Sequence, residues 1–179
     1  RGPFTTSTYQ QEAGRKLGLR AQEAMRVAQR LYENGFITYM RTDSMTLSGE
    51  ARAAAARIIE QTFGKEYLPP SPNYYGSKKG AQEAHEAIRP AGTTFRHPDE
   101  VARELGQGTL EARVYEMIWK RTIASQMAEE RYTSIVATLS ATSPQGPVIA
   151  LARGRVTDFA GFRRVYVEST DDAEAALDD

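Results

Sequence analysis

The spacing of apolar residues predicts two helices near the start of the chain. Residues 6–18 begin with hydroxyl side chains suited to N-capping and end on Gly18, a common helix terminator. Residues 20–35 place apolar side chains at the helical spacing i, i+3, i+4 and i+7, and Asn34-Gly35 ends the pattern. The face that this second helix is expected to bury consists of Ala24, Val27, Ala28 and Leu31.

Three more helices are expected further along the chain, at residues 46–63, 98–105 and 110–131. Residues 67–92 are rich in Pro, Gly and Ser, which predicts a long loop, and only residues 81–88 within it have a helical composition. The long helix at 110–131 offers a set of apolar side chains to a core: Val114, Met117, Ile118, Ile123 and Met127.

Beyond Arg131 the apolar period changes from that of a helix to that of a strand. Residues 132–141 and 146–156 flank a Pro-Gln-Gly turn and predict a pair of strands, and residues 162–169 are a candidate for a third. The fold class expected from this order is mainly α with a smaller β part, an α+β arrangement.

The same change of period divides the chain into expected domains. Residues 1–131 would form a helical domain similar to a helix-turn-helix or winged helix, because two helices joined by a short Gly-containing turn precede an extended segment. Residues 132–170 would supply antiparallel strands of a second, incomplete domain. Residues 171–179 contain five acidic residues and no basic one, and they are expected to form a disordered tail.

The composition is that of a globular protein, with 40% hydrophobic and 26% charged residues among 179. The absence of cysteine excludes disulfides, thiolate metal sites and cysteine nucleophiles. Outside the acidic tail, 23 basic residues face 18 acidic ones, and this net charge of +5 permits a phosphate-backbone partner without requiring one.

No apolar run approaches the roughly 18 residues of a membrane span. The chain starts without Met or a signal peptide, so we expect a soluble piece of a longer polypeptide.

Residues 36–44 read Phe-Ile-Thr-Tyr-Met-Arg-Thr-Asp-Ser, and Tyr39 is the side chain whose chemistry matters most here. In an extended chain Ile37, Tyr39 and Arg41 would share one face. An ordinary phenol has a pKa of about 10 and attacks at neutral pH only when a cation or a base lies nearby. Arg41 would supply that cation and a forked donor for a phosphate oxygen. The local pattern alone leaves open the commoner alternative, a half-buried strand tyrosine.

Residues 81–90 read Ala-Gln-Glu-Ala-His-Glu-Ala-Ile-Arg-Pro. On a helix, His85 and Arg89 would stand on one side and could donate together to a phosphate, and a solvated helix carrying charges is the alternative. Neither histidine of the chain lies in a pattern typical of a metal site, and Asp43 has no second carboxylate close in sequence for Mg²⁺. Residues 73–80 combine two tyrosines with two lysines, which suits either base stacking with phosphate contact or a mobile basic loop.

Three stretches taken together, residues 3–18, 28–48 and 81–90, closely resemble the central region of bacterial DNA topoisomerase I, the type IA class. Their order and approximate spacing also match that family. The resemblance is strong over residues 1–131 and looser over the strand-rich remainder. It implies an isomerase that relaxes negatively supercoiled DNA without ATP, through a transient 5′-phosphotyrosyl link to a single strand.

The resemblance also implies a role for individual residues of these motifs. Tyr39 would be the nucleophile, Arg41 the arginine that stabilises the phosphate, and His85 a histidine that contacts the phosphate. These three are the expected catalytic residues. The residues expected on the DNA-binding surface are Gln29, Glu33, Thr38, Thr42, Asp43 and Arg89.

The cofactor and the partners follow from the same resemblance. Mg²⁺ would be held by an acidic domain outside this chain, with no metal ligand within it. The partners would be single-stranded and negatively supercoiled DNA and the remaining domains of the same polypeptide, in the bacterial cytoplasm with the nucleoid and without a membrane or ATP. The chain alone would not relax DNA. The main alternative is a winged-helix DNA-binding module without covalent chemistry, and a tyrosine recombinase would need a dispersed Arg/His set that the sequence lacks.

Overall fold

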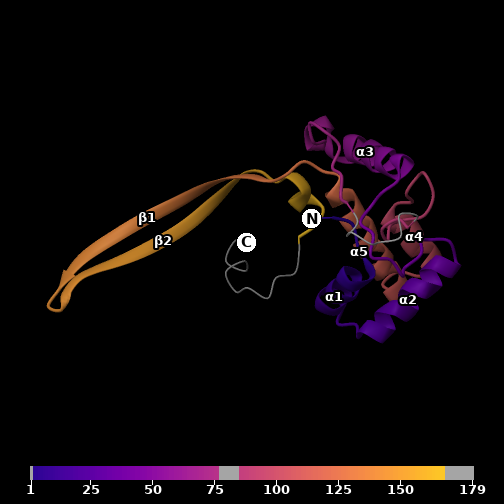
Figure 1. Ribbon diagram of the computed structural model, residues 1–179, viewed down its shortest axis with the longest axis horizontal. Helices are drawn as coiled ribbons and strands as arrows, with labels where there is room; N and C mark the ends of the chain where they lie inside the picture. The colour runs from indigo at the N-terminus through magenta and orange to yellow at the C-terminus, as the bar shows by residue number, and fades with distance from the viewer. Residues whose placement is uncertain (1, 77–84, 168–179) are drawn as a thin grey trace.

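The computed structural model describes residues 2–76 and 85–167, which form a helical body and a long hairpin that extends from it (Figure 1). This mixture confirms the α+β class predicted from the sequence. None of the helices in these residues is long and apolar enough to cross a membrane. The helices of the body are α1 (Thr6–Leu17), α2 (Ala21–Glu33), α3 (Gly49–Phe63), α4 (Pro98–Leu105) and α5 (Leu110–Ser125), with short 3₁₀ turns η1 (Lys65–Tyr67) and η2 (Gly161–Arg164).

The first two helices begin and end close to the residues that the sequence predicts. Thr5 caps α1, because its side chain accepts the Thr8 N–H while the Thr8 hydroxyl accepts the Thr5 N–H. Gly18 ends the helix in the left-handed region, at φ 69°. The predicted apolar face of α2 is buried. The Tyr9 hydroxyl donates to the Ala24 carbonyl at 2.8 Å, which joins the two helices.

Helix α5 contacts α1, α2, α3 and α4 and forms the centre of the body. The side chains predicted to belong to the core are buried along it and in the turn that follows. The helix ends at Ser125, earlier than the predicted residue 131. The Asn73 side chain donates to the carbonyls of Ser125 and Met127 at 3.0 and 3.1 Å, which satisfies groups that a longer helix would have paired internally.

Residues 85–90, called the His85 segment below, contain no helix, so the helical composition noted at residues 81–88 does not produce one in its described part. Isolated bridges pair Ile88 with Phe4 and Pro90 with Ile37. These partners come from the start of the chain and from the loop after α2. They occupy backbone groups that a helix would have paired internally, and this long-range pairing outweighs the local helical composition.

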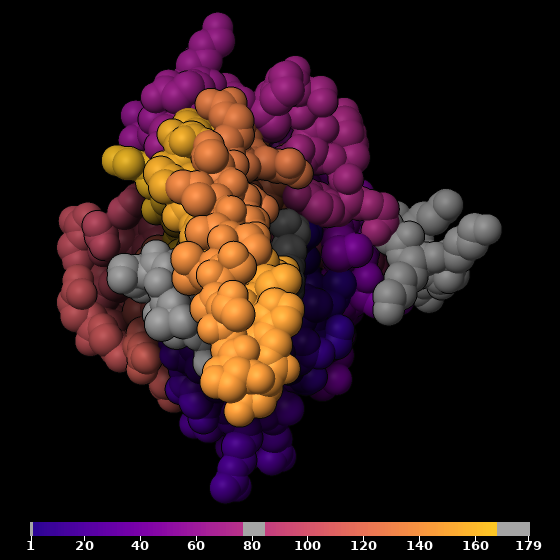
Figure 2. All heavy atoms as spheres, turned by 90° about the vertical axis from the view of Figure 1, so that its left-hand side faces the viewer, coloured from indigo at the N-terminus to yellow at the C-terminus, as the bar shows by residue number. Residues whose placement is uncertain are grey.

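The hairpin consists of β1 (Arg131–Ser143) and β2 (Gly146–Phe159), paired antiparallel with Ser143 opposite Gly146 at the turn. Figure 2, viewed from the hairpin side, shows it standing in front of the helical body. Two strands alone bury little surface and are marginal in water. Apolar side chains are exposed on both faces of the hairpin: Ile135, Val136, Leu139, Val148, Ile149, Leu151 and Val156.

The chain after β2 returns to the helical body, so the third predicted strand is wrong in its described part. Within turn η2 the Phe162 N–H donates to the Ala128 carbonyl at 3.0 Å. Tyr166 is buried, and its hydroxyl donates to Glu12 Oε1 of α1 at 2.8 Å. Contacts with the helices therefore hold the returning chain. The acidic tail expected at residues 171–179 lies outside the described residues.

Candidate active site

Residues 36–44, called the Tyr39 loop below, lie between α2 and α3. Gly35 adopts φ 74° and turns the chain at the end of α2, a conformation that favours glycine. From Tyr39 onward the burial alternates, because Met40, Thr42 and Ser44 are buried, whereas the exposed residues are Tyr39, Arg41 and Asp43. Tyr39 and Arg41 therefore share the exposed side, as the extended pattern predicts.

Ile37 does not share this exposed side, so the prediction that it faces the same way as Tyr39 is wrong. Its side chain is buried in the core, and its backbone forms an isolated bridge with Pro90. The backbone bends at Thr38 and again at Met40. The bend ends the strict alternation of a strand between Ile37 and Tyr39, which turns one side chain into the core and the other toward solvent.

The start of α1 holds the Tyr39 loop on its C-terminal side. Thr6 donates its backbone N–H to the Thr42 carbonyl at 2.8 Å. The Thr6 hydroxyl donates to the Met40 carbonyl at 2.8 Å and accepts the Thr42 N–H at 2.8 Å. The sequence indicates the hydroxyl residues here only as helix caps, and no pattern in it pairs Thr6 with a loop 34 to 36 positions later.

The His85 segment holds the Tyr39 loop on its N-terminal side. The Thr38 N–H donates to the Arg89 carbonyl at 2.9 Å. The Thr38 hydroxyl donates to the Ala87 carbonyl at 2.7 Å and accepts the Arg89 N–H at 3.0 Å. Tyr39 and His85, which are far apart in the sequence, are thereby joined through their near neighbours.

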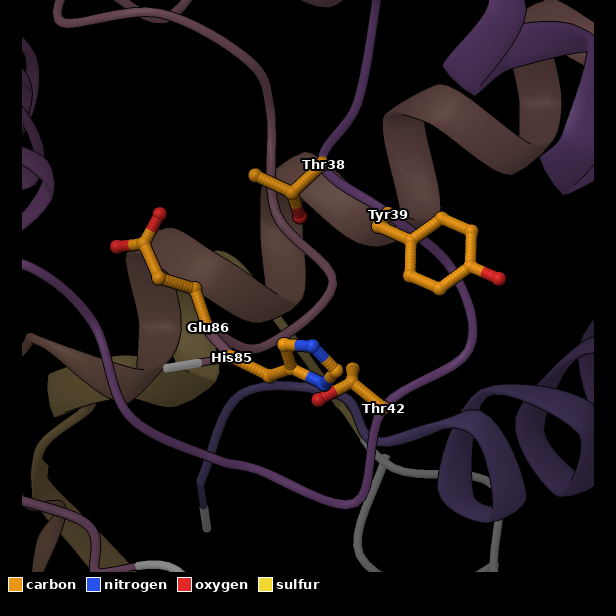
Figure 3. A pocket seen from close by; sticks show the side chains of 5 residues that line it. All are labelled: Thr38, Tyr39, Thr42, His85 and Glu86. Carbon is orange, nitrogen blue, oxygen red and sulfur yellow. The ribbon is translucent and has the colours of Figure 1, made fainter. Parts of the chain in front are cut away.

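These contacts place Tyr39 and His85 at one small cavity of about 210 Å³ (Figure 3). The imidazole of His85 extends toward the side formed by Tyr39 and Thr42, whereas the Glu86 carboxylate points away from it. Tyr39 is 44% exposed, and its ring packs edge-on against Tyr32 with the ring centroids 5.2 Å apart. The described residues that line the cavity are Thr38, Tyr39, Thr42, His85 and Glu86.

The three predicted catalytic side chains are exposed and keep their polar groups available. Within residues 2–76 and 85–167, the phenol of Tyr39, the guanidinium of Arg41 and the imidazole of His85 have no hydrogen-bond partner. Such groups can contact an incoming anion without first breaking an internal bond. Donors of this kind suit a site where negative charge develops on phosphate oxygens.

Arg89 lies in a different setting from the predicted one. It does not share a helix face with His85, because the segment is extended, and it is only 8% exposed. Its guanidinium donates to the carbonyls of Pro90 and Gly92 at 2.8 and 3.1 Å and forms an ion pair with Glu86 at 2.5 Å. These internal contacts stabilise the His85 segment and turn the Arg89 guanidinium away from solvent.

Glu86 links this ion pair to the start of α3. Its carboxylate accepts the Ser48 N–H at 2.7 Å. Partial burial by itself would raise the pKa of Glu86, but the hydrogen bonds from Arg89 and Ser48, together with the charge of Arg89, lower that pKa below its ordinary value. The ionised carboxylate thus joins the His85 segment to the helix that follows the Tyr39 loop.

Of the other residues predicted for the DNA-binding surface, Thr38 and Thr42 line the cavity and Thr42 is buried. The remaining three, Gln29, Glu33 and Asp43, are exposed but are not among the described residues that line it. Gln29 and Glu33 lie on α2, where the Gln29 amide donates to the Glu33 carboxylate at 2.8 Å. Asp43 lies in the Tyr39 loop. Of the aromatic and basic stretch predicted at residues 73–80, both lysines fall outside the described residues.

The part of the chain that the structure describes offers no metal centre. No group of three or more His, Asp or Glu side chains in it could hold a metal ion. These side chains therefore do not fit a magnesium site on their own. What they offer around Tyr39 is a set of donors for an anion.

Known proteins match this chain along nearly its whole length. The family model for DNA topoisomerase matches residues 1–178. DNA topoisomerase 1 of Synechococcus elongatus is 56% identical over 99% of this chain, and that of Mycobacterium tuberculosis is 53% identical over 95%. The solved structure of full-length topoisomerase I from Thermotoga maritima is similar, with a TM-score of 0.73 and 35% identity over 95% of this chain.

These relatives are much longer proteins. The chain spans 19% of the Synechococcus protein, 18% of the Mycobacterium protein and 27% of the Thermotoga chain. The matches therefore concern one region of each relative.

Proposed function

The chain belongs to the bacterial type IA DNA topoisomerases, and from this we propose that Tyr39 is the nucleophile of a DNA strand-transfer reaction. The observation that carries the proposal is the cavity that Tyr39 shares with His85. Both side chains reach solvent there, and no described residue binds their polar groups. Thr6 and Thr38 hold the loop on either side, so the phenol projects from a fixed backbone.

In the proposed reaction, Tyr39 Oη attacks the phosphorus of a single-stranded DNA phosphodiester. A bond from Oη to phosphorus forms while the bond from phosphorus to the 3′ oxygen of the preceding nucleotide breaks. The phenol loses its proton and the departing 3′ oxygen gains one, which leaves a 3′-hydroxyl and a 5′-phosphotyrosyl ester. The reverse reaction reseals the strand. Because one phosphodiester replaces another, the cycle needs no ATP.

Arg41 and His85 are assigned to the phosphate oxygens on which charge builds during this transfer. Arg41 lies two residues from Tyr39 on the same exposed side, and its guanidinium is a forked donor suited to phosphate. His85 reaches the same cavity from the opposite segment. Arg89 supports the His85 segment in this scheme. The exposed surface beside the cavity would contact the adjoining nucleotides through Gln29, Glu33 and Asp43, and Thr42 would contribute only where it lines the cavity.

The described residues would form one part of a larger reaction centre. Magnesium ligands would come from other parts of the longer polypeptide, because the described side chains do not fit a metal site. Residues 1–131 are assigned to the domain that carries the nucleophile. Residues 132–170 are assigned to a neighbouring domain, whose further strands would cover the apolar faces of the hairpin. The described residues after β2 nevertheless pack against the helices of the first domain.

The proposed substrate of the whole protein is single-stranded and negatively supercoiled DNA in the bacterial cytoplasm. The isolated chain is expected not to relax plasmid DNA, because it would lack the magnesium ligands and the opposing domains. Mg²⁺-dependent relaxation by the purified 179-residue chain would contradict the assignment of the magnesium ligands and the opposing domains to other parts of the polypeptide.

The test uses the full-length polypeptide that contains this chain and a single-stranded oligonucleotide labelled at its 3′ end. The reaction is stopped with denaturant in the presence of Mg²⁺, and the labelled adduct is resolved on a denaturing gel. The 3′ label stays with the protein only if the tyrosine holds the 5′-phosphate side of the break. Tyr39→Phe is expected to abolish the adduct.

Tyr32→Phe is the matched control, since Tyr32 packs against Tyr39 and its ring remains in the variant. This control is expected to form the adduct at a rate close to that of the unchanged protein. Salt-sensitive DNA binding without any adduct would instead support a winged-helix binding module without covalent chemistry.

A further inference from the structure

We propose that Thr38 is a positioning residue whose hydroxyl holds Tyr39 and His85 at a fixed separation, and that it does not bind DNA itself. This inference rests on the proposed function, because it concerns the geometry of the same transfer. It changes the role of a residue that the family resemblance assigns to the DNA-binding surface. The structural reason is that the Thr38 hydroxyl is already occupied.

The hydrogen bonds of Thr38 leave its hydroxyl proton unavailable to a phosphate. A threonine hydroxyl has one proton to donate, and here the shortest bond directs it to the Ala87 carbonyl at 2.7 Å. The same oxygen accepts the Arg89 N–H at 3.0 Å. A phosphate oxygen accepts hydrogen bonds only, so Thr38 could donate to it only by giving up the bond to Ala87.

These bonds lie next to both of the reacting side chains in the cavity. Thr38 precedes Tyr39 directly, and Ala87 lies two residues after His85. The hydroxyl therefore joins the backbone beside the nucleophile to the backbone beside the phosphate donor. Figure 3 shows Thr38 on the side of the cavity where the two segments meet.

The segments on both sides of this contact are themselves held in place. Thr6 fixes the Tyr39 loop on its other side through the Met40 carbonyl and the Thr42 N–H. The Arg89–Glu86 ion pair fixes the His85 segment, and Glu86 also accepts the Ser48 N–H. Thr38 thus adds a side-chain link to the backbone bond from its own N–H to the Arg89 carbonyl, and loss of the hydroxyl would loosen the contact between the two segments beside the reacting side chains.

Removing the hydroxyl should therefore slow the chemical step more than it weakens DNA binding. Thr38→Val keeps the shape of the side chain and removes the hydroxyl, Thr38→Ala removes the hydroxyl and the γ-methyl, and Thr38→Ser keeps the hydroxyl. The cleavage rate is expected to fall about tenfold to a hundredfold in the Val and Ala variants, as for a small misplacement of reacting groups. The Ser variant is expected to stay within about threefold of the unchanged protein.

The variants are made in the full-length polypeptide, and two quantities are measured for each. The first is the single-turnover rate of adduct formation with Mg²⁺ and excess protein, and the second is the Kd for the same oligonucleotide without Mg²⁺. Thr133→Val is the matched control, because Thr133 donates to Asp158 at 2.8 Å on the exposed hairpin. A raised Kd with an unchanged cleavage rate in Thr38→Val would mean that Thr38 binds DNA, and would overturn the inference.

A double-mutant cycle separates positioning from general destabilisation. If Thr38 acts by holding His85 near Tyr39, His85→Ala should cost less in the Thr38→Val background than in the unchanged protein. Independent, multiplicative losses, or failure of Thr38→Ser to restore the rate, would overturn the inference. The proposed function fails separately, and this inference with it, if Tyr39→Phe still forms the adduct. An adduct that requires Tyr39 and ignores Thr38→Val removes only the inference.

Discussion

Substitution by alanine is expected to affect a different property at each of the two arginines of the motifs: the cleavage rate at Arg41 and the free energy of unfolding at Arg89. Arg41 is exposed and has no hydrogen-bond partner within residues 2–76 and 85–167, so Arg41→Ala should change the free energy of unfolding by less than about 0.5 kcal/mol. Its loss should nevertheless slow cleavage by about a hundredfold to a thousandfold, or about 2.7–4 kcal/mol of activation free energy, as for a donor to a developing oxyanion. The substitution thus separates chemistry from folding.

Arg89→Ala is the matched comparison, because the guanidinium of Arg89 is used for structure. The variant loses the ion pair with Glu86 and the hydrogen bonds to the carbonyls of Pro90 and Gly92. Two carbonyls lose a donor and one carboxylate loses its cation, although Glu86 keeps some contact with solvent. We expect a destabilisation of about 2–4 kcal/mol.

The assay combines denaturant unfolding of the chain with single-turnover cleavage by the full-length polypeptide. Arg41→Ala should unfold at the same denaturant concentration as the unchanged chain and cleave far more slowly. Arg89→Ala should unfold at a clearly lower concentration. Normal cleavage by Arg41→Ala would refute its assignment to the phosphate, and a large loss of stability in the same variant would show that its guanidinium has a structural partner.

Three further substitutions test separate parts of the structure. His85→Ala should slow cleavage with little loss of stability, since the imidazole is exposed, and unfolding of the variant would show instead a structural histidine. Because the pKa of Glu86 is lowered on folding, its stabilising contribution exists above the ordinary value of 4.5 and is lost as the pH falls through the lower folded value. Unfolding curves of Glu86→Gln and the unchanged chain should therefore differ most at neutral pH and converge below about 4.5, and a constant difference would contradict the ion pair. Tyr9→Phe should cost about 1 kcal/mol in thermal unfolding through the lost bond to Ala24, and an unchanged melting temperature would argue against that bond.

Helices with strong local signals could be predicted from the sequence, and segments held by distant partners could not. The apolar spacing in α2 predicted its buried face correctly because the helix period is a local property. The His85 segment has a helical composition, yet it is extended because its backbone pairs with residues near the start of the chain and after α2. No local pattern reveals such partners.

The same distinction applies to the candidate site. The exposed side shared by Tyr39 and Arg41 follows from alternation over three consecutive positions. The contacts of Thr6 and Thr38 with other segments do not follow from it, because a hydroxyl in sequence gives no indication of a carbonyl 34 or 49 positions away. The orientation of Ile37 was predicted wrongly for a related reason, since its bridge with Pro90 is a contact with a distant segment and the loop bends directly after it, at Thr38.

The central claim is that Tyr39 forms a covalent bond with DNA, and peptide mapping of the trapped adduct tests it most directly. The full-length protein is reacted with single-stranded DNA and Mg²⁺, denatured, digested with nuclease and protease, and sequenced by mass spectrometry. The account predicts a nucleotide 5′-phosphate on Tyr39 and an unmodified Tyr32. A nucleotide on Tyr32 or on any other residue, or no modified peptide at all, would contradict it.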